Sequence, residues 1–207
     1  MRFKNRTNAG NQLAQKLKIN RPNQTIIVAL PRGGVPLGLE ISTIHHIPFD
    51  VVLAKKIVHP LQSEFAIGAI AEDGFPIINE TLNVDREWIE EDTNRVRLEL
   101  KRRRKQYDKF LTQRPLSKKD VIIVDDGIAT GMTMFAAIEA VKNQMPNRII
   151  VAVPIIPKDT NRILESRVDE VIAIEVPSQF RGAVGAYYQD FSQVSDAEVE
   201  EMIRNHE

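Results

Sequence analysis

The sequence predicts an α/β fold in which a mostly parallel, twisted sheet carries helices on both faces. Short apolar runs without polar alternation, such as residues 121–124, are typical of strands that are buried on both faces. These runs alternate with segments of helix-forming composition, which is the pattern of a parallel sheet with crossover helices. Glycine-bearing loops follow two of the runs, at residues 31–34 and 127–133, and ligands bind at the edge of the sheet where such loops lie.

The individual elements follow from composition and periodicity. An N-terminal helix is indicated by Ala9, Leu13 and Leu17, which share one helical stripe. The expected strands are rich in Ile and Val and cover residues 25–30, 50–55, 121–124, 148–153 and 170–176. The expected helices after them cover residues 35–43, 85–111, 133–143, 159–166 and 196–204.

The segment after the second strand is the least regular part of the chain. Residues 56–66 are polar and contain one proline, so they are expected to form a loop. Residues 67–71 and 75–78 are expected to pair as a hairpin around the sequence Glu-Asp-Gly at 72–74.

Composition indicates a single domain of ordinary globular type. The chain has 207 residues, no cysteine, and 28 basic against 28 acidic residues. A net charge of zero argues against a nucleic-acid or membrane partner, and the basic run at 95–109 has acidic residues close by. Neither a signal-peptide core nor a membrane-length apolar run occurs in the sequence, so we expect a cytoplasmic protein.

The stretch VIIVDDGIATGMT, residues 121–133, joins a buried strand to a loop suited to an anion. Asp125 and Asp126 end the strand as hydrogen-bond acceptors, and side by side they gain little from each other without a ligand. Gly127 and Gly131 allow close backbone approach, and free N–H groups at the start of the next helix can bind phosphate. A ligand with vicinal hydroxyls and a phosphate, such as ribose 5-phosphate, fits both halves.

This stretch resembles the diphosphoribose-binding motif of the type I phosphoribosyltransferases, in which two acidic residues precede a loop ending in Thr-Gly-x-Thr. The whole chain is most similar to a bacterial branch of that family that has no assigned substrate. The resemblance implies that Asp125 and Asp126 hold the ribose hydroxyls and contribute to a Mg²⁺ site, directly or through substrate and water. The residues that would hold the 5-phosphate and its surroundings are Gly127, Ile128, Ala129, Thr130, Gly131, Met132 and Thr133.

The resemblance also implies a pyrophosphate site on two further segments. Arg32, Gly33 and Gly34 follow the first strand, where the family keeps its pyrophosphate loop. Lys55 and Lys56 stand where a mobile loop begins in the family, which makes residues 57–66 the expected lid. Without the resemblance, the first group would be a plain turn and the lysines would be solvated surface residues.

The C-terminal segment 176–191 resembles the base-binding segment of the purine-type members. Phe180 is the expected stacking ring, with Tyr187 or Tyr188 next, and Lys158 stands where that group contacts the base. An exposed loop lysine is the alternative interpretation of Lys158. The hypoxanthine-guanine enzymes carry an acid at the position of Ala129, so no general base is assigned here.

The implied organisation is one domain, residues 1–207, with a core at about 25–176 and a hood formed by residues 1–24 and 177–207. The implied reaction transfers the phosphoribosyl group of 5-phosphoribosyl 1-pyrophosphate (PRPP) to a small nitrogenous acceptor, in the first place a nucleobase, with Mg²⁺. The alternative is a regulatory protein of the same fold that binds ribose phosphates without turnover. Assembly as a homodimer is left open.

Overall fold

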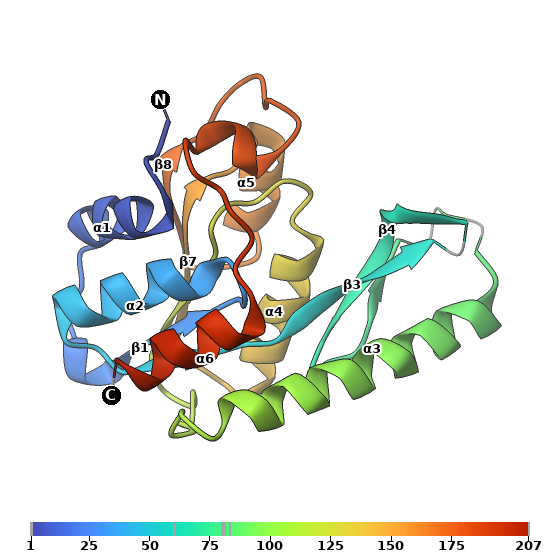
Figure 1. Ribbon diagram of the computed structural model, residues 1–207, viewed down its shortest axis with the longest axis horizontal. Coiled ribbons are helices and arrows are strands. Elements are labelled where there is room, and N and C mark those ends of the chain that lie inside the picture. Colours follow the sequence, from blue (N-terminus) through green and yellow to red (C-terminus); the bar gives the residue numbers. More distant parts are fainter. Residues whose placement is uncertain (1, 60, 80–81, 83, 207) are drawn as a thin grey trace.

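The computed structural model describes residues 2–59, 61–79, 82 and 84–206 and shows a five-stranded parallel sheet (Figure 1). The strands are β1 (Thr25–Ala29), β2 (Phe49–Val51), β6 (Asp120–Val124), β7 (Arg148–Ile155) and β8 (Glu170–Glu175). Their order in the sheet is β2-β1-β6-β7-β8, and every neighbouring pair is parallel. The predicted fold class is therefore confirmed.

Helices cover both faces of this sheet. The helices are α1 (Arg6–Lys16), α2 (Gly34–His45), α4 (Met132–Asn143), α5 (Lys158–Glu165) and α6 (Asp196–Arg204), with short 3₁₀ turns η1 (Pro22–Gln24) and η2 (Val184–Tyr187). Ile27 on β1 packs in the cluster that contains the buried faces of α1, α2 and α6, whereas Ile26 and Val28 pack in the cluster that contains α4. Because successive side chains on a strand point to opposite faces, an all-apolar strand satisfies both clusters.

A second unit projects from the sheet. It consists of the antiparallel strands β3 (Ala54–His59), β4 (Gln62–Ala71) and β5 (Ile77–Ile78) and the long helix α3 (Arg86–Tyr107). Val96 and Leu100 on α3 share one buried cluster with Ile57, Ile67 and Ile70 of β3 and β4. Figure 1 shows this unit extending to one side, with its free end far from the sheet. We call residues 54–107 the arm and the rest of the chain the body.

The arm corrects two predictions. The expected strand at 50–55 ends at Val51, and a separate strand begins at Ala54, so the expected continuous strand is wrong. The expected loop at 56–66 is also wrong, because β3 runs to His59 and β4 begins at Gln62. The hairpin around residues 72–74 is confirmed, since β5 pairs with β4 in antiparallel fashion, although β5 has only two residues.

The two ends of the chain meet on the body. The Phe3 N–H donates to the Tyr187 carbonyl at 2.8 Å, and the Gln189 N–H donates to the Phe3 carbonyl at 2.8 Å. Phe3 is fully buried, so this pairing belongs to the core. The role of residues 1–24 and 177–207 as a hood stays a prediction. Among the described residues, no helix combines the length and the apolar character that crossing a membrane requires.

Candidate active site

The two predicted ligand loops lie side by side at the carboxyl edge of the sheet. Parallel neighbours β1 and β6 end together, with Ala29 opposite Val124. The Leu30 N–H continues the pairing by donating to the Val124 carbonyl at 2.9 Å. The loop after β1 therefore runs beside the loop after β6, in the place where parallel sheets bind ligands.

Gly33 shows how closely the two loops approach each other. A Cβ atom built on Gly33 would clash with the carboxylate of Asp126, and one on Gly34 would lie 2.5 Å from the Val124 carbonyl oxygen. Glycine at 33 leaves room for the Asp126 carboxylate, and glycine at 34 is required because the Val124 backbone leaves no space for a side chain. The motifs at 31–34 and 121–133, which are almost ninety residues apart in the sequence, therefore lie against each other.

Asp126 is held by the protein itself. Arg6 Nε donates to Asp126 Oδ2 at 2.8 Å, and only 12% and 14% of the two side chains are exposed. The Arg6 guanidinium lies 3.9 Å above the Phe191 ring centre and donates to the Ser192 carbonyl at 2.6 Å. The Tyr188 hydroxyl donates to the Asp126 carbonyl at 2.6 Å. Arg6 was not predicted, because nothing in the sequence near α1 indicates a contact 120 residues away.

The two carboxylates differ in their electrostatic surroundings. Burial raises the pKa of Asp125 well above its usual value, and the neighbouring charge of Asp126 raises this pKa further. Burial also raises the pKa of Asp126, but the Arg6 guanidinium opposes that shift. Asp125 has no salt-bridge partner within the described part of the chain. A ligand that brings positive charge or hydroxyl donors would therefore stabilise ionised Asp125.

The loop after the carboxylates leads into a helix N-terminus. The Ile128 N–H donates to the Ile155 carbonyl at 2.9 Å, and the Ile128 side chain is buried, so Ile128 fastens the loop to β7. Gly131 has φ of +79°, a conformation that favours glycine, and α4 begins at the next residue, Met132. The first N–H groups of a helix have no intrahelical partners, so this turn offers donors to an anion.

Three further loop residues differ in exposure. Thr130 is exposed and Thr133 is half-buried. The Ala129 carbonyl accepts a hydrogen bond from the Thr160 hydroxyl at 3.0 Å, which orients the loop. Phosphate binding by residues 127–133 stays a prediction that this geometry supports.

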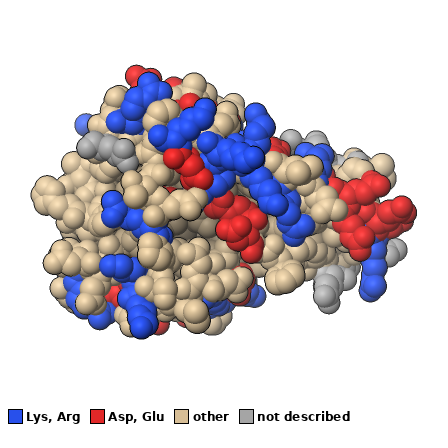
Figure 2. All heavy atoms as spheres, turned by 90° about the horizontal axis from the view of Figure 1, so that it is seen from below, with Lys and Arg blue, Asp and Glu red and all other residues tan. Residues whose placement is uncertain are grey.

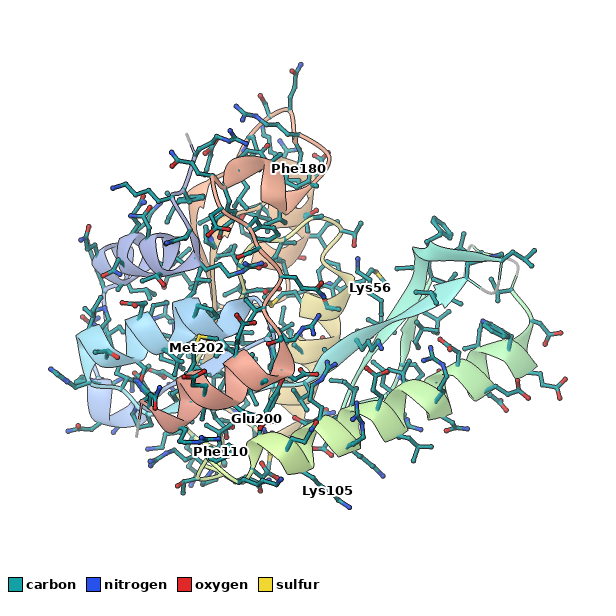
Figure 3. All side chains as sticks on the ribbon, in the orientation of Figure 1. Lys56, Lys105, Phe110, Phe180, Glu200 and Met202 are labelled. Atoms are coloured by element: carbon teal, nitrogen blue, oxygen red, sulfur yellow. The ribbon has the colours of Figure 1, made fainter. Side chains whose placement is uncertain are left out.

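The predicted basic residues lie on two separate segments, the loop after β1 and the strand β3. Arg32 is half-buried after β1. Lys55 Nζ lies 2.5 Å from Glu99 Oε2 of α3, and Arg103 Nη2 lies 3.4 Å from the other oxygen of the same carboxylate. Hydrogen bonding from Lys55 lowers the pKa of Glu99. Lys56 is exposed on β3 where the arm leaves the body (Figure 3). Of the two lysines predicted to bind ligand, Lys55 is therefore held in an ion pair by the arm. Lys56 forms no salt bridge with any described residue.

The predicted base-binding residues do not form an open aromatic face. Phe180, on the loop after β8 (Figure 3), stacks on Tyr187 with ring centres 5.5 Å apart and an angle of 22° between the planes. Tyr187 and Tyr188 are each only 1% exposed. Phe180 is half-buried and Lys158 is exposed at the start of α5. Of the three rings, Phe180 has the most accessible surface, and base stacking stays a prediction.

A protein-built metal cage is not found in the described residues, because no three His, Cys, Asp or Glu side chains lie close enough to hold an ion. A Mg²⁺ ion at this site would draw most of its ligands from substrate oxygens and water, as Mg²⁺ commonly does. Of the two carboxylates, Asp126 is paired with Arg6, whereas Asp125 has no salt bridge among the described residues.

Comparisons with known proteins show the family to which this fold belongs. A family model described as "Phosphoribosyl transferase domain" matches residues 3–190. Two curated relatives from Mycobacterium tuberculosis, provisionally named phosphoribosyl transferases, are 36% identical over 201 residues, which is 95% of this chain. The chain spans 45% of the length of those relatives.

Solved structures show the same fold. A protein from Thermus thermophilus superposes with a TM-score of 0.83 at 36% identity, and the match covers 99% of both chains. A protein from Aquifex aeolicus superposes with a TM-score of 0.51 at 12% identity, over 83% of this chain and 74% of that one, which supports the fold alone.

Proposed function

Because the chain belongs to the phosphoribosyl transferase domain family, we propose that it transfers the 5-phosphoribosyl group of PRPP to a nitrogen nucleophile. The observation that supports this most directly is the close approach of Gly33 to Asp126. It brings the loop suited to pyrophosphate against the carboxylates suited to ribose. In the reaction, the bond from C1 of ribose to pyrophosphate breaks, and a bond from C1 to nitrogen forms.

The residues divide this work by position. Asp125 and Asp126 accept hydrogen bonds from the ribose hydroxyls, and the N-terminus of α4 binds the 5-phosphate. Arg32 and Lys55 neutralise the pyrophosphate as it leaves, which lowers the energy of the transition state. Catalysis then consists mainly of positioning and charge stabilisation, for which the rigid sheet edge is suited.

Magnesium completes the charge balance in this proposal. Asp125 would hold the ion, either directly or through water. Bound Mg²⁺ supplies positive charge that offsets the pyrophosphate and favours the ionised form of Asp125, whose pKa burial otherwise raises.

The acceptor is proposed to be a nucleobase or another small nitrogenous molecule, with Phe180 as the stacking ring. Ala129 has no titratable side chain, so no residue is assigned as general base. We place the protein in the cytoplasm, where PRPP and nucleobases occur together.

One observation favours a second candidate, a regulator that binds ribose phosphates without turnover. The Arg6 guanidinium occupies the Asp126 oxygen that would meet a ribose hydroxyl. A ligand must either share that oxygen with Arg6 or displace it. A protein that only binds its ligand could use this exchange as a signal.

A screen distinguishes the two candidates. The protein would be incubated with PRPP, Mg²⁺ and single nucleobases or small amines, and pyrophosphate release would be measured. The enzyme proposal expects release that depends on one acceptor and is lost in Asp125→Asn. Calorimetric binding of PRPP without release, for any acceptor, would favour the regulator, and the absence of PRPP binding would contradict both.

Arg32→Ala tests the assignment of the leaving-group loop. Arg32 lies on a different loop from the phosphate-binding turn, so the variant should lose about tenfold in affinity for pyrophosphate, the equivalent of one charge-assisted hydrogen bond. Its affinity for ribose 5-phosphate should change little. Equal losses for both ligands would show that the loop is wrongly assigned.

A further inference from the structure

The outward face of α3 carries an ordered charge pattern that the proposed reaction does not use. The exposed residues that repeat at alternating spacings of four and three along this face are Glu87, Glu91, Asn94, Leu98, Lys101 and Lys105. Spacings of four and three place side chains on one stripe of a helix. We call this set the α3 stripe. It spans about 27 Å at 1.5 Å per residue, and it faces solvent along its whole length.

The α3 stripe is acidic at one end and basic at the other. Figure 2, which views the molecule from below, shows a group of acidic atoms at the free end of the arm and, toward the body, a larger group of basic atoms with some acidic atoms beside it. Among the described residues, no salt bridge involves Glu87, Glu91, Lys101 or Lys105. An unpaired helix face of this kind has its charges available for an external partner.

Favourable interaction with the helix dipole does not account for the whole pattern. That effect acts within the first and last turns, whereas Glu91 and Lys101 lie beyond those turns of a helix that runs from residue 86 to residue 107. In addition, Glu87 and Glu91 are like charges four residues apart, as are Lys101 and Lys105. Such pairs destabilise an isolated helix, so an ordinary solvated face would be expected to mix the signs.

The charges of the α3 stripe are complementary to those of a second α3 stripe that runs in the opposite direction. A second α3 can be placed antiparallel to the first, with a two-fold axis at residue 96. Glu87 then faces Lys105 of the other copy, and Glu91 faces Lys101. The symmetry repeats each pair, which gives four attractions. Asn94 then faces Leu98. The two Leu98 side chains, each 70% exposed in one chain, meet beside the axis, where an isolated apolar residue would be buried. A symmetric interface requires self-complementarity of this kind.

A cavity beside the basic end of the stripe would receive the partner's acidic end. It has a volume of about 910 Å³, and its lining includes Lys101, Lys105 and Arg114 together with the acidic residues Asp50, Glu72 and Asp73. In the antiparallel arrangement the acidic free end of each arm would meet the Lys101 and Lys105 side of this cavity in the other copy. We propose that the protein forms a two-fold symmetric dimer in which the two α3 stripes pack antiparallel. This inference is independent of the proposed reaction.

Sedimentation equilibrium of the full chain at low and high salt tests the proposal. Wild type should dimerise, and the dimer should weaken at high salt because exposed ion pairs are screened. Lys101→Glu with Lys105→Glu should weaken dimerisation by about tenfold or more, since four attractions become repulsions worth a few tenths of a kcal/mol or more each. Glu87→Lys with Glu91→Lys should weaken it similarly.

The decisive experiment restores dimerisation by combining the charge reversals. An equimolar mixture of the two reversed variants should form a heterodimer, and the chain with all four reversals should again form a homodimer. The control reverses two exposed acids on α5, Asp159→Lys and Glu165→Lys, and should leave dimerisation unchanged, because α5 lies on the opposite side of the body from α3 (Figure 1). Circular dichroism checks that each variant is folded.

Three outcomes would overturn the proposal. The first is a wild-type monomer at low salt. The second is a dimer that the reversals do not weaken, and the third is a pair of weakened variants that do not associate when mixed. Binding of the basic half to RNA, lost in Lys101→Glu with Lys105→Glu while wild type stays monomeric, would assign the surface to a nucleic acid instead.

Discussion

Adjacent residues of the same type have different roles in this protein, as Asp125 and Asp126 show. Asp126 forms a mostly buried ion pair with Arg6, whereas Asp125 accepts a hydrogen bond from the Asp126 N–H and has no salt bridge among the described residues. The sequence indicated that the two charges gain little from each other without a ligand, and the Arg6 contact gives Asp126 a partner within the protein. One carboxylate is therefore expected to affect stability and the other to affect binding alone.

Asp126→Asn should lower the free energy of unfolding by about 2 kcal/mol, because it removes a charged hydrogen bond and leaves Arg6 buried without its counter-charge. Asp125→Asn should leave stability unchanged or raise it, since burial disfavours the charge that the change removes. Both variants should lose about tenfold in PRPP affinity. Urea unfolding and calorimetry measure the two effects, and equal stability of both variants would contradict the assignment.

Glu72 in the arm is expected to make stability depend on pH. Its side chain is 11% exposed, its Oε2 lies 3.6 Å from Arg104 Nε, and burial raises its pKa from 4.5 to about 7. Between these two values the folded state binds a proton that the unfolded state has released. The free energy of unfolding should therefore fall as pH rises through this range, by about 3 kcal/mol at 1.36 kcal/mol per pKa unit.

Glu72→Gln should remove that part of the pH dependence, because glutamine does not titrate. Urea unfolding at pH 4.5 and pH 8 would show a smaller difference in the variant than in wild type. Glu91→Gln, on the exposed face of α3, is the matched control and should keep the wild-type difference. An unchanged difference in Glu72→Gln would show that Glu72 has an ordinary pKa.

At the scale of elements, a carboxylate of α3 forms an ion pair with a lysine of the neighbouring strand. Glu99 on α3 holds Lys55 on β3 through a 2.5 Å ion pair. A pyrophosphate that recruits Lys55 must compete with this carboxylate. Glu99→Gln should therefore strengthen pyrophosphate binding several-fold, within the roughly 1 kcal/mol that partly exposed ion pairs contribute. Calorimetry with pyrophosphate measures this effect.

The comparison variant for that experiment is Glu91→Gln, which lies on the same helix but on its outward face. It should leave pyrophosphate binding unchanged. If Glu99→Gln weakens binding instead, the carboxylate positions Lys55 for the ligand and does not compete with it.

The elements that the sequence predicted well are those buried in the body. β6 and β7 are continuous apolar runs, because both of their faces are covered, and that composition is visible without a structure. The part of β3 after residue 55 and the first residues of β4 were missed. Polar residues such as Lys56 and His59 occur within β3, and their polarity was taken to indicate a loop. The length of α3 was predicted to within a few residues from its density of helix formers.

At the scale of the whole molecule, the start of the chain stabilises the region behind the site. The Phe3 ring is fully buried with its centre 5.3 Å from that of Tyr188, whose hydroxyl holds the Asp126 carbonyl. Phe3→Ala should lower the free energy of unfolding by about 3–5 kcal/mol and weaken PRPP binding as well. Phe75→Ala is the control, since Phe75 is 84% exposed, and it should change neither quantity.

Urea unfolding and calorimetry on both phenylalanine variants test this expectation. A loss well below 1 kcal/mol for Phe3→Ala would show that the terminal segment is dispensable. A loss of stability without any loss of affinity would show that Phe3 supports the fold and not the site.

The part of the site that could not be predicted from the sequence depends on long-range contacts. Asp125, Gly33 and Gly131 lie in local motifs whose residue types suit a ligand, so their roles could be proposed from the sequence and stay predictions. Arg6 reaches Asp126 through a fold that joins the first helix to the middle of the chain. No local sequence pattern indicates the contact between Arg6 and Asp126, because it forms only when the sheet has assembled.

The strand order has a consequence for how the chain folds. The centre of the sheet pairs residue 25 with residue 120, and the whole arm lies between them in the sequence. Pairing of β1 with β6 must therefore wait for the closure of a long loop, and chains dominated by such non-local contacts fold slowly. The arm, whose strands and helix are neighbours in sequence, can form its own contacts earlier. Stopped-flow refolding should therefore show that substitutions in β6 slow folding more than equally destabilising substitutions in α4, whose turns form locally.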